Sequence, residues 1–201
     1  MTRGAQTRDR IVDRAFRLAT RDGLEGVTIG SLATDLKMSK SGLIAHFGSK
    51  EDLQVEVIRS AAQRFEEHVL RPSFTGPRGE PRVRRLFQRW ITWVSDPGLP
   101  GGCLFLAAAT ELDDRAGPPR DALVTTQRAL AATLAKSARI ASEEGHFRRN
   151  LDAEQFAFDL FSIVIAYHHA KRLLRDPKAE SKAKSAFERL LDASRAATRK
   201  H

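Results

Sequence analysis

The chain lacks the sequence features of disulfide-bonded, secreted and membrane-spanning proteins. It contains one cysteine, Cys103, among 201 residues, which excludes an internal disulfide framework and favours a reducing, cytoplasmic location. Several charged residues among the first ten interrupt any early apolar run, so no secretory leader is predicted. The most apolar later stretch, Phe156–Tyr167, contains Asp159 and is too short to cross a bilayer. We therefore expect a soluble protein with no membrane partner.

The sequence also lacks the motifs of common enzymes. It has no glycine-rich phosphate loop, no nucleophile elbow and no plausible catalytic triad. His168 and His169 are adjacent, so on a helix they point about 100° apart, and no cysteine or histidine pair has metal-ligand spacing. Cys103 lies in an apolar run, which is more typical of a small core residue than of a redox or electrophile sensor. We accordingly assign no catalytic residue, metal ligand or cofactor.

No stretch alternates apolar and polar residues for long enough to form a sheet, and the chain is expected to be all-α with about nine helices. Helix-capping residues, glycines and prolines determine the expected bounds of the helices. Gly23 is predicted to end the first helix as a left-handed cap, and Pro72 to end the fourth. Asp152 is predicted to cap the eighth, which ends before Pro177. The remaining expected bounds are 7–21, 49–70, 81–95, 103–114, a long helix after 117–119 that ends at 144, and 181–197.

Residues 28–53 have the layout of a helix-turn-helix. Thr28 is a good cap for a short helix with one apolar face, formed by Ile29, Leu32, Ala33 and Leu36. The turn at 37–39 then leads to a second short helix capped by Ser39. Two short helices joined by so tight a turn cross steeply, which is typical of DNA-reading motifs.

The second short helix is predicted to bury only Leu43 and Phe47. Its exposed side and flanks then hold small, polar or basic residues: Lys40, Ser41, Gly42, Ile44, Ala45 and His46. A slim leading turn fits the major groove, where base edges are read by short side chains and cations. Ser49 begins a further helix at once, and Lys50 in its first turn is a candidate phosphate contact.

Net charge agrees with a polyanionic partner without requiring one. The chain has 34 lysines and arginines against 25 aspartates and glutamates, a formal charge of +9. The excess is spread along the sequence, with nine basic and five acidic residues in the first 50. Without the motif, solvated helix faces would explain this balance equally well.

The run Ser39-Lys40-Ser41-Gly42-Leu43, followed by His46-Phe47-Gly48-Ser49-Lys50-Glu51-Asp52-Leu53, resembles the signature of the tetracycline-repressor (TetR) family of bacterial transcription regulators. The likeness extends upstream to Ile11. It implies a three-helix DNA-binding domain at 1–50 and a helical effector-binding and dimerisation domain at 51–201. The resemblance and the motif together give these DNA-binding candidates: Thr28, Ser39, Lys40, Ser41, Gly42, Ile44, His46 and Lys50.

One position departs from the family pattern. The family commonly has an aromatic residue, often tyrosine, where this chain has Ile44, and that tyrosine usually touches the DNA backbone. An isoleucine has no hydrogen-bonding group for a phosphate, so an apolar contact to a thymine methyl group is the alternative at Ile44.

The helix opened by Asp152 is apolar all round, so every side of it must be covered. It is either the central helix of a monomer or a helix that also packs on a second copy of the chain. The resemblance implies the second, because family members generally pair through their last two helices into a four-helix bundle. The predicted interface residues are Phe161, Ile165, Leu190 and Leu191.

The C-terminal part carries more aromatic surface than a small bundle needs for packing, although each aromatic taken alone is more typical of core. Only the resemblance implies an effector pocket there. Its predicted lining is Phe87, Trp90, Trp93, Phe105, Phe158 and Phe161, with Glu111 and His168 as polar anchors.

The sequence therefore predicts a homodimeric regulator, most simply a repressor, that binds double-stranded palindromic operator DNA and is released by a small apolar or aromatic effector. Two alternatives remain open. One is a constitutive DNA-binding or nucleoid-type protein without effector. The other is a helical small-molecule-binding protein or enzyme.

Overall fold

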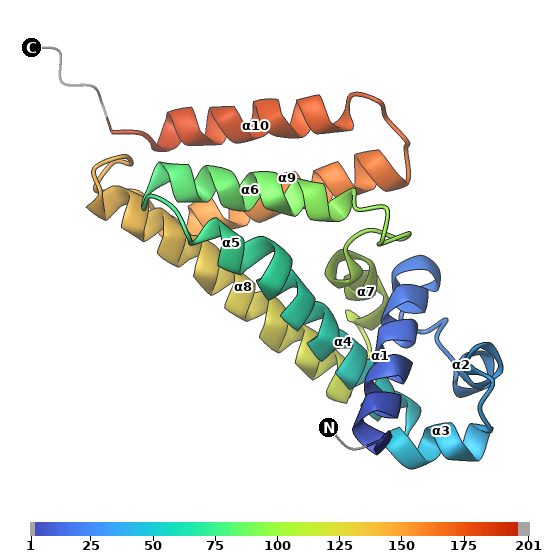
Figure 1. The fold of residues 1–201 in the computed structure, drawn as a ribbon. Coiled ribbons are helices and arrows are strands. Elements are labelled where there is room, and N and C mark those ends of the chain that lie inside the picture. The colour runs from blue at the N-terminus through green and yellow to red at the C-terminus, as the bar shows by residue number, and fades with distance from the viewer. Residues whose placement is uncertain (1–2, 197–201) are drawn as a thin grey trace, which may run out of the picture. The chain divides into compact units, whose positions relative to one another are not determined.

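The computed structural model describes residues 3–196, and every regular element among them is a helix (Figure 1). The prediction of an all-α fold is confirmed. Residues 50–73 form one unbroken helical segment, and counting it once gives nine helical segments in the described chain. The elements are α1 Arg3–Asp22, α2 Ile29–Leu36, α3 Lys40–Phe47, α4 Lys50–Phe65, the π-helix η1 Glu66–Leu70, α5 Arg71–Ser73, α6 Glu80–Val94, α7 Leu104–Leu112, α8 Pro118–Glu143, α9 Ala153–Arg172 and α10 Ala179–Ser194.

The chain divides into two compact units. Unit 1 comprises residues up to Phe65 together with Ser95–Thr126, and unit 2 comprises Glu66–Val94 together with the residues from Gln127 onward. Within the described range, no helix is both long enough and apolar enough to cross a membrane.

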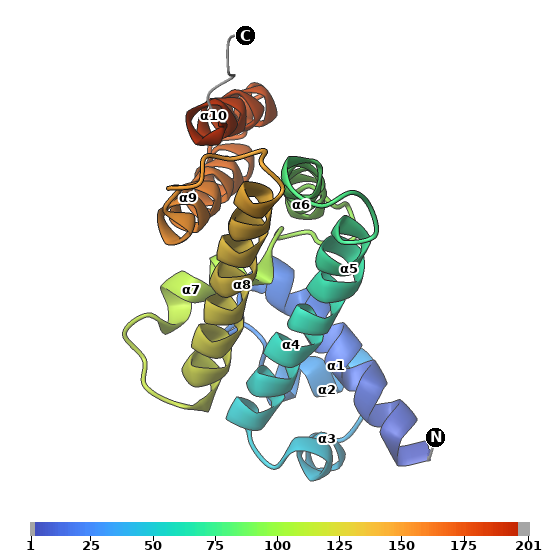
Figure 2. The same ribbon diagram turned by 90° about the vertical axis from the view of Figure 1, so that its left-hand side faces the viewer.

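Unit 1 is built on the contact between α1 and α4 (Figure 2). The inner face of α1 is apolar at helical spacing, and Ile11, Ala15 and Ala19 are fully buried there. Two polar contacts join the same pair of helices, because the Arg64 guanidinium donates to Asp13 at 2.7 Å and lies 4.8 Å from the centre of the Phe16 ring. α1 is therefore held against α4, and it also contacts α2, the first of the two short helices that follow it.

The predicted caps of the short helices are confirmed. Gly23 has φ +81° and donates its N–H to Ala19 O at the end of α1. Thr28 Oγ1 accepts the Ser31 N–H at 3.0 Å to begin α2, and Ser39 Oγ accepts the Gly42 N–H at 3.0 Å to begin α3.

The expected end of the fourth helix at Pro72 was wrong. The helix passes through η1 and continues to Ser73. Pro72 follows η1 inside this continuous segment and has no N–H to donate within the helix. The last expected helix is shifted toward the N-terminus, to Ala179–Ser194, and its predicted end at Ala197 lies outside the described residues.

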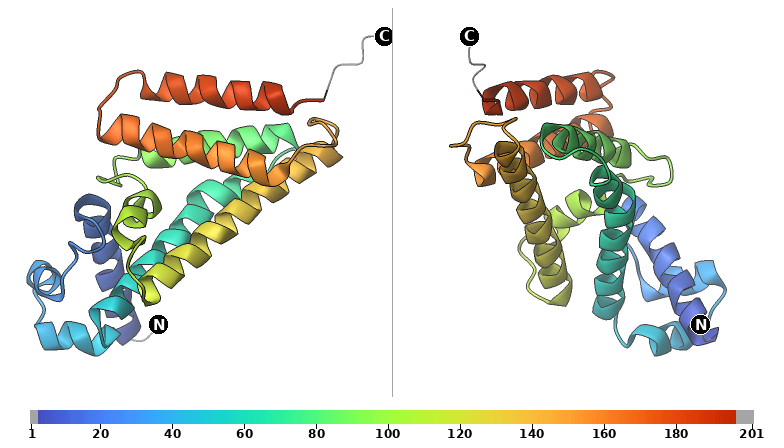
Figure 3. Two further views of the ribbon diagram at one scale, coloured as in Figure 1. Left: turned by 180° about the vertical axis from the view of Figure 1, so that it is seen from behind. Right: turned by 60° about the vertical axis from the view of Figure 1, so that its left-hand side comes forward.

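Unit 2 is a helical bundle in which α9 packs on both α6 and α10 (Figure 3). Aromatic contacts join these helices: Phe87 of α6 stacks on Phe187 of α10 at 4.0 Å, and Trp90 lies 5.6 Å from Phe161 of α9. α6 and α10 are also linked by Arg84, which donates to Glu188 at 2.6 Å.

Candidate nucleic-acid interface

The turn between α2 and α3 is as tight as the sequence predicts. Lys37 ends α2 in the left-handed conformation, with φ 55°, and the Met38 N–H returns to Ala33 O at 2.9 Å. Leu43 and Phe47 of α3 are buried, and so are Leu32 and Ala33 of α2. These anchors fix the side of α3 that faces solvent.

The solvent side of α3 carries exposed Lys40, Ser41, Ile44 and Ala45. Gly42 and His46 are half-buried at its flanks. The surface combines one cation, one hydroxyl and one large apolar side chain on an otherwise slim helix. Such a face can enter a groove and present different chemistry to different base edges.

The beginning of α2 gathers groups that suit a phosphate. Thr28 is exposed at the cap. The position that a Cβ atom of Gly30 would take lies 3.8 Å from Lys40 Nζ and 3.9 Å from Thr28 Oγ1. The Lys40 ammonium and the Thr28 hydroxyl thus both lie beside the first turn of α2, where the helix dipole is positive. No local sequence pattern indicates that Lys40 lies here rather than beside a base.

Lys50 has partners within unit 1. Its ammonium donates to the Glu25 main-chain oxygen at 3.1 Å and to the Glu25 carboxylate at 3.0 Å. Gln54 is buried and donates to the same carboxylate, also at 3.0 Å. The hydrogen bonds from Gln54 and Lys50 hold the pKa of the Glu25 carboxyl below its usual range. Lys50 therefore holds the loop between α1 and α2 through Glu25. Its ammonium is not free for a phosphate, contrary to the expectation from the sequence.

Glu111 was predicted as a polar anchor in an effector pocket, and this was wrong. Its carboxylate accepts the main-chain N–H groups of Leu24 at 3.1 Å and Glu25 at 2.8 Å. A Cβ atom on Gly23 would lie 2.5 Å from Glu111 Oε1 and would displace this carboxylate, and the positive φ of Gly23 independently favours glycine. Glu111 satisfies backbone donors left over where α1 ends. No local sequence signal connects residues that are 86 positions apart.

The other residues predicted to line the effector pocket do not all lie together. Phe87, Trp90 and Trp93 are buried in unit 2, and His168 there is half-buried. Phe105 belongs to unit 1, where its ring lies 5.9 Å from Phe65. Phe158 was predicted to line the pocket, but its side chain is 67% exposed on the outer face of α9, so that part of the prediction was wrong.

Three of the four residues predicted to form the dimer interface are at least partly exposed in the protomer. Ile165 is 45% exposed, and Phe161 and Leu190 are half-buried. Leu191 is fully buried within its own protomer, because it lies on the inner side of α10, and it cannot also contact a second copy.

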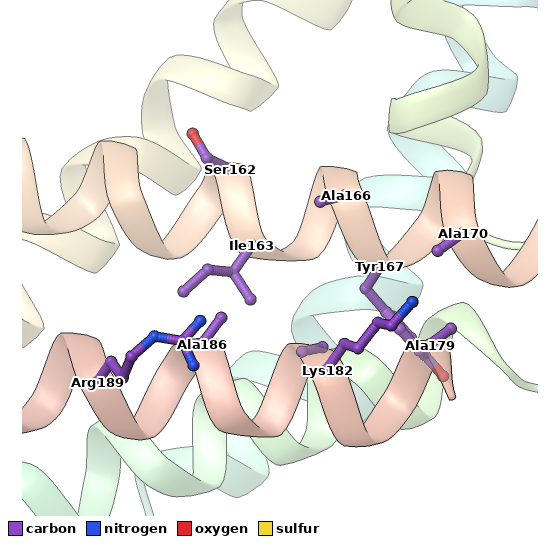
Figure 4. A pocket seen from close by; sticks show the side chains of 10 residues that line it. Ser162, Ile163, Ala166, Tyr167, Ala170, Ala179, Lys182, Ala186 and Arg189 are labelled. Atoms are coloured by element: carbon purple, nitrogen blue, oxygen red, sulfur yellow. The ribbon is translucent and has the colours of Figure 1, made fainter. Parts of the chain in front are cut away.

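A groove runs between α9 and α10 beside these residues. Its volume is about 460 Å³. Figure 4 shows Ile163 and Tyr167 of α9 and Lys182 and Arg189 of α10 lying in the space between the two helices. Alanines form most of the remaining lining: Ala166, Ala170, Ala179, Ala183 and Ala186. Small residues on facing helices leave a concave apolar surface that another helix can approach closely.

Taken together, unit 1 has the geometry of a helix-turn-helix that reads DNA, supported by a third helix and fixed by its own caps. Comparison with protein families gives the same result over most of the chain. Residues 11–57 match the bacterial regulatory proteins of the tetR family, and residues 79–187 match the tetracyclin repressor-like C-terminal domain. The chain therefore belongs to the TetR family of DNA-binding transcriptional regulators, and the resemblance seen in the sequence is confirmed.

Solved structures agree on the fold. A TetR transcriptional regulator from Chloroflexus aurantiacus is 23% identical with a TM-score of 0.84, and the match covers 96% of each chain. AibR, solved in complex with isovaleryl coenzyme A and operator DNA, is 22% identical with a TM-score of 0.70 over 89% of this chain and 96% of its own. A putative transcriptional regulator from Saccharomonospora viridis, in complex with choline, is 21% identical with a TM-score of 0.78 over 96% and 99%. No curated protein matches the chain.

Proposed function

We propose that the protein is a homodimeric repressor that binds a palindromic operator through α2 and α3 and is released by a small apolar or aromatic effector. The observation that carries this proposal is the solvent side of α3, which is slim, exposed and held in place by buried Leu43 and Phe47. The protein would act in the cytoplasm, where operator DNA is accessible, and the proposal includes no catalytic step.

The DNA contacts are assigned by position. Lys40, Thr28 and the first turn of α2 bind one phosphate, which fixes the register of the unit on the duplex. Ser41, Gly42 and Ile44 meet base edges, and His46 borders them. Lys50 contributes indirectly, because it holds the loop that precedes α2 through Glu25.

Residues 1–50 are proposed as the DNA-binding domain and 51–201 as the effector-binding and dimerisation domain. Compact unit 1 extends farther than the first of these, since it includes all of α4 and the segment 95–126. Part of the proposed second domain therefore contacts the first, since Glu111 accepts hydrogen bonds from Leu24 and Glu25 in the loop that precedes α2.

The dimer is proposed to form through the exposed faces of α9 and α10. Phe158, Phe161 and Ile165 lie at helical spacing on α9, and Leu190 lies on α10. A two-fold pairing would present two α3 helices to half-sites about one DNA turn apart, which is why a palindromic operator is expected.

The effector is proposed to bind among the aromatics of unit 2, chiefly Phe87, Trp90, Trp93 and Phe161, with His168 as a polar anchor. The ligand complexes of AibR and of the Saccharomonospora viridis regulator support a pocket of some kind in this fold. A ligand that weakens operator binding a hundredfold, worth about 2.7 kcal/mol, must itself bind the DNA complex a hundredfold more weakly.

The test begins with an operator obtained by selecting a random duplex pool with the full-length protein. A library of small apolar and aromatic compounds is then screened for release of that operator by fluorescence anisotropy. Release by at least one compound, with matching stabilisation of the free protein in a thermal shift assay, is the expected result. Tight, selective operator binding that no compound in a broad library weakens would contradict the effector part of the proposal. In that case a constitutive DNA-binding protein would be the better description.

A further inference from the structure

Ile44 is the only large apolar side chain that is exposed among the described residues of unit 1. It lies near the middle of the solvent side of α3, one turn after Lys40 and Ser41. Its side chain is 44% exposed. The other large exposed apolar side chains in the described chain, such as Phe158 and Ile165, belong to unit 2.

Nothing in the stability of α3 explains an isoleucine at this position. A β-branched residue is a slightly worse helix former than alanine or a long straight side chain. The anchors of α3 are Leu43 and Phe47, which are buried, whereas Ile44 is exposed and does not help to hold the helix in place. Single exposed apolar residues are common on protein surfaces, so the place of Ile44, rather than its exposure alone, is informative.

The neighbours of Ile44 make it the most prominent side chain of this face. Ser41 and Ala45 are small, Gly42 has no side chain, and Lys40 reaches back toward the first turn of α2. An isoleucine has no hydrogen-bond donor for a phosphate oxygen or for a base edge. In the major groove the apolar group available to it is the C5-methyl group of thymine.

We propose that Ile44 reads a thymine through its 5-methyl group and so determines part of the operator sequence. This inference rests on the proposed function, since it assumes that α3 enters the major groove. It adds the identity of a base and the atom by which that base is recognised. The contact is apolar, so its contribution to affinity depends little on salt, unlike that of Lys40.

The experiment removes only the methyl group. The selected operator is resynthesised with deoxyuridine in place of each thymidine in turn, at symmetry-related positions of both half-sites, and binding is measured with the full-length protein. We expect one thymine per half-site at which deoxyuridine weakens binding about fourfold per half-site, as removal of one buried methyl group predicts. Deoxyuridine at the other thymines is expected to be neutral.

Two variants of Ile44, measured on the same duplexes, complete a double-mutant cycle between the side chain and the thymine methyl group. Ile44→Ala should bind the thymine operator more weakly than the wild type and should lose the response to deoxyuridine at that position, whereas Ile44→Val should keep part of it. Both variants are expected to fold, because the side chain is exposed, and circular dichroism checks this. Wild-type binding that is insensitive to deoxyuridine everywhere, or an Ile44→Ala variant that remains fully sensitive, would overturn the inference while leaving the proposed function intact. Failure to select any sequence from the natural pool would instead overturn the proposed function, and this inference with it.

Discussion

Lys40 and Lys50 stand at the first positions of successive helices but have different surroundings. Lys40 is exposed beside the beginning of α2, while Lys50 is bonded to Glu25. Lys40→Ala should therefore weaken binding to operator and random DNA alike and reduce the salt slope by about one for each protomer bound. Lys50→Ala should leave the slope unchanged and lower the stability of unit 1.

Salt titrations of DNA binding and urea unfolding of both variants measure these effects. Lys136→Ala, an exposed lysine of α8 in unit 2, is the matched control and should change neither quantity. An unchanged slope for Lys40→Ala, or a reduced slope for Lys50→Ala, would reverse the two assignments.

Gly101 shows how closely the segment before α7 approaches α1. A Cβ atom at this position would lie 1.0 Å from the Thr20 main-chain oxygen, so the two backbones would have to separate. Gly101→Ala should destabilise the protein by more than about 3 kcal/mol, at the upper end of single substitutions. Gly4→Ala is the control, because nothing lies within 4 Å of its Cβ position in α1, and it should be neutral or stabilise by about 0.5–1 kcal/mol. Equal unfolding midpoints for both variants would show that the approach is not so close.

The sequence determines some of these local features and not others. Thr28 and Ser39 are recognisable as caps because a cap bonds to a residue three positions on. Ion pairs such as that of Lys50 with Glu25 depend on how distant segments meet, which no local pattern reports. The same reason explains why Glu111 was misassigned and why Gln54 was not noticed at all.

Among the elements, the loop between α1 and α2 is joined to several parts of unit 1 through one carboxylate. Glu25 accepts from Gln54 and Lys50 of α4, and Arg115 lies 3.3 Å from it. The pKa of Glu25 is lowered, so the folded state holds the charged form more strongly than the unfolded state does. This contribution to stability is fully present above the ordinary pKa of 4.5 and is lost as pH falls through the lower, folded value.

Glu25→Gln should therefore lower the free energy of unfolding at pH 7 and flatten its decline below about pH 4.5. The effect should not exceed about 1 kcal/mol, since the carboxylate side chain is 39% exposed to screening solvent. Urea unfolding at a series of pH values measures it, with the exposed Glu51→Gln as control. A decline with pH identical to that of the wild type would show that Glu25 does not contribute to acid sensitivity.

Most of the helices were predictable from the sequence, because the spacing of apolar residues and the capping residues, glycines and prolines act on nearby positions of the chain. Gly23, Ser39 and Asp152 end or begin helices as expected. The π-helical segment at Glu66–Leu70 and the continuation of the helix past Pro72 were not predictable. A proline in a sequence usually indicates the end of a helix, but here the helix continues through Pro72 directly after a π-helical turn.

At the level of the assembled protein, the apolar character of α9 predicts that every side of this helix is covered, and the protomer itself covers the sides that face α6 and α10. Its inner residues, such as Phe156 and Val164, are buried in the protomer, and Ile165 remains exposed. The sequence alone does not show which face of α9 is buried in the protomer and which is exposed, because a helix that is apolar all round has no preferred buried face. Leu191 of α10 was also assigned to the interface, but its side chain is fully buried within the protomer.

Ile165→Arg tests the proposed dimer surface. Because Ile165 is exposed in the protomer, arginine should be tolerated by its fold, but it would place an unpaired charge in an apolar interface at a cost of several kcal/mol. We expect folded monomers in light scattering and a loss of operator affinity. Ala132→Arg, at an exposed position of α8, is the control and should remain dimeric. A dimeric Ile165→Arg variant would place this residue outside the interface.

The proposed dimer should regulate transcription from a few specific operators. Genome-wide footprinting in the organism that carries the gene measures this. We expect a small number of protected sites that share one palindrome, with half-sites about one DNA turn apart. Uniform coverage of the genome, or no protected site at all, would contradict it.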